Sequence, residues 1–96
     1  MSREKRKPPQ PFTDAFGLAV KELRKKRGLS QEQLALEADL QRTYVSDVER
    51  GARNPTVAVV KVLADALGTV PSELFRLTEQ YYEKLVGEKL GNSHQQ

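Results

Sequence analysis

Apolar residues between Phe12 and Lys89 recur at steps of three or four positions, and glycine interrupts this spacing at Gly28, Gly51 and Gly68. That spacing is typical of α-helices with one buried face, and glycine is the commonest residue just past a helix end. The pattern therefore predicts several short helices separated by tight turns. A chain of 96 residues is long enough for one hydrophobic core and too short for a second.

The apolar spacing predicts five helices, at about 12–27, 31–39, 41–50, 57–67 and 71–89. Thr13 or Asp14 is available to cap the first helix. Ser30 and Gln33 have the spacing of a capping box at the start of the second helix. Asp39 tolerates the left-handed conformation that the following turn requires.

One segment is ambiguous on composition alone. The run 57–62 is rich in valine, which favours a strand. The apolar pattern continues to Leu67, however, and places Lys61 and Asp65 together on one polar side, so we expect a helix. Pro71 suits the first turn of the last helix. The predicted fold class is therefore all-α.

The composition excludes several kinds of chemistry. Cysteine is absent, and the only histidine, His94, lies in the polar tail 92–96, so we expect no metal site. The candidate catalytic acids lie on short solvent-facing helices, with no histidine, cysteine or phosphate-binding loop nearby. These acids are Glu32, Glu37, Asp39 and Asp47. We therefore expect no enzyme activity and no cofactor. No apolar stretch approaches the roughly 20 residues of a membrane span, and we expect a cytoplasmic protein.

Basic residues are concentrated in the first half of the chain. Residues 1–54 contain twelve Lys or Arg and eight Asp or Glu, a net charge of +4, whereas residues 55–96 carry −1. This asymmetry indicates a surface for a polyanion, although ordinary solvated charge is the alternative. The basic, proline-rich residues 1–11 are expected to form a disordered arm that either follows DNA or only solubilises the chain. Residues 91–96 are expected to form a disordered tail.

The segment 31–51 predicts two short helices joined by a turn of about three residues. Ala35 is small enough to let these helices cross closely, facing Val45 and Val48. The second helix then points outward, in the arrangement of a helix-turn-helix. Such a helix fits the major groove of DNA, where Arg binds guanine and Gln binds adenine.

Four segments in the same order resemble one family: residues 28–35 (GLSQEQLA), 44–51 (YVSDVERG), 54–55 (NP) and 63–68 (LADALG). They resemble the Cro/repressor (XRE) helix-turn-helix family over residues 16–75. The run from Arg42 to Ser46 also resembles the recognition helix of controller proteins from restriction-modification systems. The resemblance implies a five-helix, lambda-repressor-like DNA-binding domain at 12–90 with an extended C-terminal helix. Asp39 departs from the glycine that the family more often has at the turn.

The resemblance also implies roles for individual residues. Those expected to reach bases or the adjoining backbone are Gln41, Arg42, Thr43, Tyr44, Ser46 and Asp47. Those expected to contact phosphates are Gln31, Arg50, Arg53 and Asn54. Arg42 is the strongest candidate, against an ordinary surface arginine, and Gln31 has simple helix capping as its alternative. Asp47 either accepts a hydrogen bond from cytosine or repels phosphates in wrong registers. Arg24 and Glu49 match a structural ion pair that joins the first helix to the third.

The last helix has more apolar surface than one core contact needs. Its apolar residues spread over about 220°, whereas a surface helix usually has a stripe of about 100°. We expect a two-fold dimer, which would place two recognition helices about 34 Å apart. Its interface residues are predicted to be Leu77, Tyr81, Tyr82, Leu85 and Val86. Packing of this helix on its own domain is the alternative.

The sequence thus predicts a homodimeric regulator of transcription that binds double-stranded DNA at a palindromic operator and controls its own synthesis. The alternative is a protein-interaction module, antitoxin-like or coactivator-like, whose last helix binds another protein.

Overall fold

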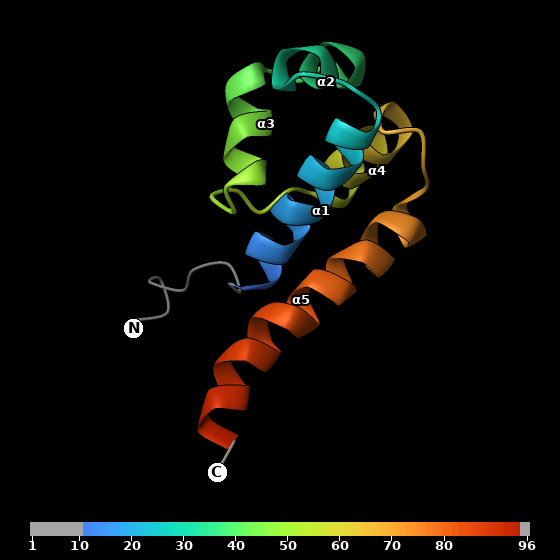
Figure 1. Cartoon of the computed structure of the whole chain (residues 1–96). Helices are drawn as coiled ribbons and strands as arrows, with labels where there is room; N and C mark the ends of the chain where they lie inside the picture. Colours follow the sequence, from blue (N-terminus) through green and yellow to red (C-terminus); the bar gives the residue numbers. More distant parts are fainter. Residues whose placement is uncertain (1–10, 95–96) are drawn as a thin grey trace.

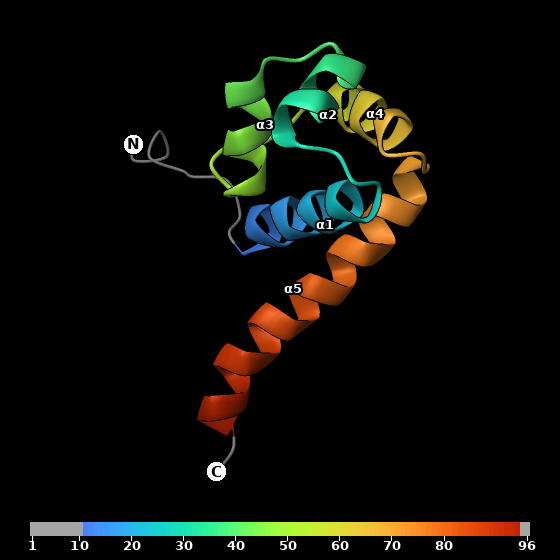
Figure 2. The same ribbon diagram turned by 45° about the horizontal axis from the view of Figure 1, so that its top comes forward.

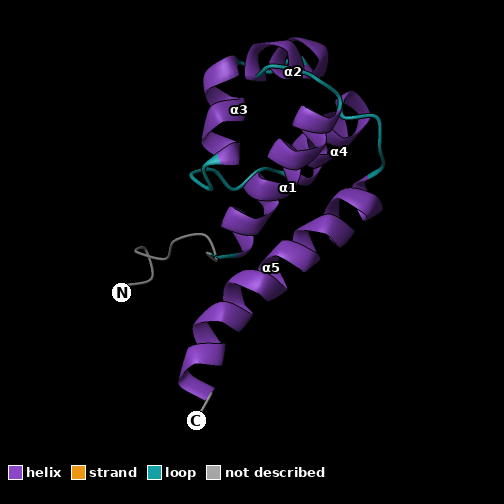
Figure 3. Ribbon diagram, viewed as in Figure 1, coloured by secondary structure: helices purple, strands orange, loops and turns teal. Residues whose placement is uncertain are grey.

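The computed structural model describes residues 11–94, with side chains described for residues 11–87. This part of the chain contains five helices and no strand: α1 (Phe12–Lys26), α2 (Gln31–Ala38), α3 (Arg42–Glu49), α4 (Val57–Ala66) and α5 (Pro71–His94) (Figures 1 and 3). The predicted all-α fold is confirmed, including a helix where the valine run could have favoured a strand. The predicted basic arm, except for Pro11, lies outside the described residues.

Helix ends follow the local signals in the sequence. Ser30 Oγ accepts from the Gln33 amide at 3.0 Å, and Gln33 Oε1 accepts from the Ser30 amide at 2.7 Å, so the predicted capping box is present. Asp39 has φ 58° and ψ 45°, the left-handed conformation expected of it. Gly51, just past the end of α3, has φ 77°, a value that most side chains disfavour. The α2–turn–α3 unit is therefore fixed at both ends by its own sequence.

Two predictions at helix ends are wrong. α1 begins directly after Pro11, whose carbonyl accepts from the Ala15 amide at 2.8 Å, so Thr13 and Asp14 lie inside the first turn and neither is the N-cap. α5 continues to His94, so residues 91–94 are helical rather than part of a tail. No proline follows Pro71, and glycine within a helix weakens it by only about 1 kcal/mol, so Gly87 and Gly91 do not end α5.

The helices pack around one core beneath the α2–α3 pair. Buried side chains from all five helices form this core, among them Phe16, Val20, Leu34, Leu63 and Leu74. α5 packs mainly against α1, and its last turns project away from the other helices in both views (Figures 1 and 2). The fold therefore presents α3 on one side and the free end of α5 on another.

α1 and α3 cross in close contact at Gly17. A Cβ at this position would overlap the carbonyl oxygens of Val48 and Glu49, the latter at 2.5 Å. Gly17 is buried, and its lack of a side chain lets the end of α3 lie directly on α1. This contact helps to set the angle at which α3 leaves the domain.

Candidate nucleic-acid interface

The contact between α2 and α3 is made by small and branched side chains. Ala35 is 3% exposed and lies in the same buried cluster as Val45 and Val48. The Leu40 amide donates to the Ala35 carbonyl at 2.8 Å and closes the turn after Asp39. The two helices therefore cross as the sequence predicted, with α3 at the outside of the molecule (Figure 2).

The side chains of α3 divide into an inner and an outer face. Val45, Val48 and Glu49 are buried. The outer positions, at successive steps around the helix, hold Arg42, Thr43, Ser46 and Asp47, preceded by the exposed N-cap Gln41. Tyr44 lies at the border, with its ring partly buried against the core. The structure thus brings the six predicted base-contacting residues onto one surface.

The predicted phosphate contacts lie outside α3, on the first turn of α2 and on the segment that follows α3. Arg50, Arg53 and Asn54 are exposed in the segment after α3. Arg53 packs over the Tyr44 ring, with its guanidinium carbon 4.9 Å from the ring centre. Gln31, at the first turn of α2, is half-buried. Cationic and amide groups therefore flank the outer face of α3, as a helix in a DNA groove requires.

A buried ion pair joins α1 to the end of α3. Arg24 Nε donates to Glu49 Oε2 at 2.6 Å, and Arg24 Nη2 donates to Glu49 Oε1 at 3.0 Å. The Arg24 side chain also donates to the Leu29 carbonyl at 2.8 Å. Gln31 Nε2 donates to Glu49 Oε1 at 3.0 Å, so this residue is tied to the ion pair as well as lying near the predicted phosphate site. The network links α1, α2 and α3 at the base of the interface.

Asp47 contacts two of the cations on the interface. Its Oδ1 accepts a short hydrogen bond from Arg50 Nη2, and its Oδ2 lies 3.6 Å from Arg53 Nε. The hydrogen bond from Arg50, helped by the charges of Arg50 and Arg53, holds the pKa of the Asp47 carboxyl below its usual value. Asp47 is therefore ionised at neutral pH while it is paired with both arginines.

A shallow hollow adjoins the start of α3. The residues that line it are Asp39, Leu40, Gln41, Thr43, Tyr44 and Arg53. Its walls combine amide, hydroxyl and guanidinium groups with the apolar faces of Leu40 and Tyr44. Such a surface offers both hydrogen bonds to base edges and apolar contact to a methyl group.

The residues predicted to form a dimer face already have contacts within the chain. Leu77 and Tyr81 pack against the core, and the Tyr82 ring meets the Phe12 ring edge-on, with centres 5.3 Å apart. Leu85 and Val86, on the next turn of α5, are half-buried. Leu77, Tyr81 and Tyr82 thus make the contacts that the alternative, packing of the last helix on its own domain, expects of them.

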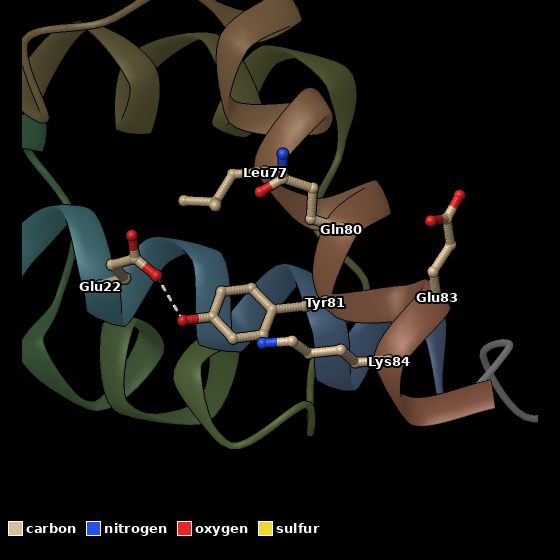
Figure 4. Close-up of a pocket in the computed structure, with 6 residues that line it drawn as sticks. All are labelled: Glu22, Leu77, Gln80, Tyr81, Glu83 and Lys84. Carbon is tan, nitrogen blue, oxygen red and sulfur yellow. Dashed lines mark hydrogen bonds between the residues drawn. The ribbon is translucent and has the colours of Figure 1, made fainter. Parts of the chain in front are cut away.

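A groove between α1 and α5 contains a hydrogen bond that joins the two helices (Figure 4). The Tyr81 hydroxyl donates to Glu22 Oε1, and Lys84 Nζ lies 5.7 Å from the centre of the Tyr81 ring. The bond to Glu22, with partial burial and the carboxylate charge, raises the pKa of Tyr81. This link fixes α5 along α1.

The sequence did not reveal several of these contacts. Nothing local indicates that Arg53 would stack on Tyr44 and approach Asp47, or that Tyr81 would reach Glu22. Gly17 did leave a signal, because a glycine inside a helical pattern often marks close packing. That signal identifies a contact without naming its partner.

The described part of the chain has neither a membrane-spanning helix nor a cluster of metal-ligating side chains. Residues 11–94 contain no helix that is both long and apolar enough to cross a membrane. Over the same residues, no group of three or more His, Cys, Asp or Glu side chains is placed to hold a metal ion.

A short helix, a tight turn and an outward second helix with a polar face define a helix-turn-helix protein. The sequence profile of the helix-turn-helix family matches residues 20–75, more than half of the chain, and the chain belongs to this family. The resemblance of residues 28–68 to a helix-turn-helix family is therefore confirmed.

Similar proteins include restriction-modification controllers. The chain is 45% identical over 64 residues to control protein C.BamHI of Bacillus amyloliquefaciens, covering 66% of this chain and 79% of that protein. It is 47% identical to the solved controller protein C.AhdI of Aeromonas hydrophila, with a TM-score of 0.64 over 65% of this chain and 94% of that one. The controller C.Esp1396I, solved as a tetramer on its natural 35-base-pair operator, is 26% identical, with a TM-score of 0.70 over 76% of this chain and 96% of that one.

Proposed function

We propose that this protein is a sequence-specific regulator of transcription that binds a two-fold symmetric operator as a homodimer and controls its own synthesis. The observation that carries the proposal is the outer face of α3. There the side chains of Gln41, Arg42 and Thr43 are exposed. Arg50 is exposed just past the end of the helix, where Gln31 Nε2 donates to Glu49 Oε1 at 3.0 Å. The similarity to control proteins and to an operator-bound controller supports the same function.

In the proposed complex α3 enters the major groove. Arg42 binds guanine, Gln41 binds adenine, and Thr43 and Ser46 contact either base edge. Tyr44 contacts a base or the backbone beside them. The residues that bind phosphates and fix the register are Gln31, Arg50, Arg53 and Asn54. The Arg24–Glu49 pair orients α3 from behind and touches no DNA.

Dimerisation would use the projecting part of α5. Leu85 and Val86 retain exposed apolar surface, and Tyr82 lies beside them one turn earlier. Leu77 and Tyr81 would contribute at the edge of the dimer interface, because their side chains are already partly covered by the core. A two-fold contact here presents two copies of α3 to successive turns of one face of DNA.

The same proposal places the protein in the cytoplasm, without enzyme activity or cofactor. The alternative of a module that binds a different polypeptide through α5 has no observation in its favour, since the relatives are controllers and regulators.

The proposal is tested by selecting sites from random DNA with the purified protein. We expect a two-fold symmetric site. The Arg42→Ala variant should bind it about 10- to 100-fold more weakly, with relaxed preference at one base pair in each half-site. Arg76→Ala is the matched control, because Arg76 is exposed on α5 and pairs with Glu73 of the same helix. Recovery of no preferred sequence would refute the proposal.

A further inference from the structure

Asp47 is an acidic side chain within the cationic part of the proposed interface. Its carboxylate contacts Arg50, and it lies 3.6 Å from Arg53 Nε. Arg53 also packs over the Tyr44 ring, with its guanidinium carbon 4.9 Å from the ring centre. One carboxylate therefore contacts two of the guanidinium groups that would bind phosphate.

The stability of α3 gives no reason for a carboxylate at this position. Asp47 lies in the last turn of α3, where the helix dipole disfavours negative charge. Its ion pairs are with side chains that are 60% and 52% exposed, and pairs of this kind add little to folding stability. The arrangement is thus better explained by what the two arginines bind than by the fold.

We propose that Asp47 is an internal competitor of DNA phosphates for Arg50 and Arg53, and that it restrains binding to non-operator DNA. The inference rests on the proposed function and adds a specificity-determining residue to it. The carboxylate occupies the same guanidinium donors that a phosphate oxygen would use, so a phosphate must displace it or accept a weaker contact.

The restraint acts most on non-operator DNA. Binding without base contacts depends on phosphates, and the protein then samples many registers. In many of those registers a phosphate meets the Asp47 carboxylate and is repelled. On an operator, base contacts from Arg42 and its neighbours hold the protein in one register. In that register Arg50 and Arg53 can each reach a phosphate while the Asp47 carboxylate stays beside them.

The test uses the full chain with Asp47→Asn and, as a matched control, Asp65→Asn. Asp65 is exposed and pairs with Lys61 at 2.9 Å, so it is likewise an aspartate with a cationic partner, and both substitutions raise the net charge by one. Asp65 lies on α4, across the domain from α3 in both views (Figures 1 and 2). Affinity for a random-sequence duplex and for the selected operator is measured over a series of salt concentrations, with circular dichroism to show that each variant is folded.

We expect Asp47→Asn to bind the random duplex about three- to ten-fold more tightly at about 50 mM salt, with a log–log salt slope steeper by up to about 0.9. Operator affinity should rise by a smaller factor, and Asp65→Asn should bind the random duplex like the wild type. An equal gain on the operator and on the random duplex would overturn the inference. Random-duplex affinities that match between the two variants would overturn the inference. So would a loss of operator affinity without a gain on random DNA, which would make Asp47 a base contact. If the wild type selected no operator, that result would instead contradict the proposed function.

Discussion

At the scale of single residues, the Arg24–Glu49 pair has the largest energetic consequence, because both side chains are almost completely buried. The side chains of Arg24 and Glu49 are 9% and 3% exposed. Loss of one partner would leave a charge in the core without its counter-ion, which typically destabilises a protein by 3 kcal/mol or more, whereas exposed pairs contribute about 0–1 kcal/mol. The position of α3 therefore depends on a contact that lies behind it.

We expect Arg24→Ala to lower the free energy of unfolding by about 3 kcal/mol, because the Glu49 carboxylate stays buried without its bidentate partner. DNA affinity should fall in parallel, since α3 loses its support. Urea unfolding measures the first effect and operator binding the second. Lys26→Ala is the matched control: its pair with Glu22, at 3.7 Å, is exposed, and the expected loss is below about 0.5 kcal/mol. Equal stability of Arg24→Ala and the wild type would show that the pair does not support the fold.

At the scale of helices, the sequence predicted most of what is local. The bounds of α2 and α3 could be predicted because Ser30, Gln33, Asp39 and Gly51 act on the backbone within a few residues of themselves. The outer face of α3 followed from helical spacing alone. The start of α1 was predicted within a residue, but its N-cap was not, because Pro11 has no capping side chain and better cap formers follow it in the sequence.

Contacts between distant segments could not be predicted in the same way. The Tyr81–Glu22 hydrogen bond joins residues 59 positions apart, and the bond from Arg27 to the Ala66 carbonyl joins residues 39 apart. No local pattern fixes such distances, because they depend on how whole helices pack. The Arg24–Glu49 pair, 25 positions apart, was expected only because the family resemblance implied it.

The Tyr81–Glu22 bond between α1 and α5 predicts a dependence of stability on pH. The pKa of Tyr81 is raised in the folded protein, chiefly by its hydrogen bond to Glu22. The stabilisation is complete below the pKa of the unfolded tyrosine, about 10, and is lost as pH rises through the higher folded pKa. The free energy of unfolding of the wild type should therefore fall above about pH 10 and approach that of Tyr81→Phe, which lacks the bond at every pH.

Denaturant titrations at several alkaline pH values measure this difference. Tyr82→Phe is the control, because it keeps the aromatic contact with Phe12 and leaves the Tyr81 hydroxyl in place. It should retain the pH dependence of the wild type. A constant difference between the wild type and Tyr81→Phe through this range would show that the hydrogen bond does not contribute.

At the scale of the whole molecule, recognition of a symmetric operator requires two copies of α3 with a fixed separation. One copy reads only a half-site, so a monomer would forfeit the gain in affinity that comes from linking two binding events. The C-terminal half of α5 is the segment best placed to join two chains, because its last turns project away from the other helices (Figure 1) and its Leu85 and Val86 are only half-buried. Dimerisation and DNA affinity should therefore be lost together.

We expect Leu85→Asp to shift the protein from dimer to monomer at micromolar concentration, because each interface would then bury two uncompensated carboxylates related by the two-fold axis. Operator affinity should fall at least about ten-fold, while affinity for an isolated half-site stays near that of the wild type. Ser72→Asp adds the same charge at the opposite end of α5 and should leave both properties unchanged. Sedimentation equilibrium and operator titration measure the two effects. A Leu85→Asp dimer as stable as that of the wild type would show that the interface lies elsewhere. A monomeric wild type that still binds the full operator tightly would show that the two chains assemble only on DNA.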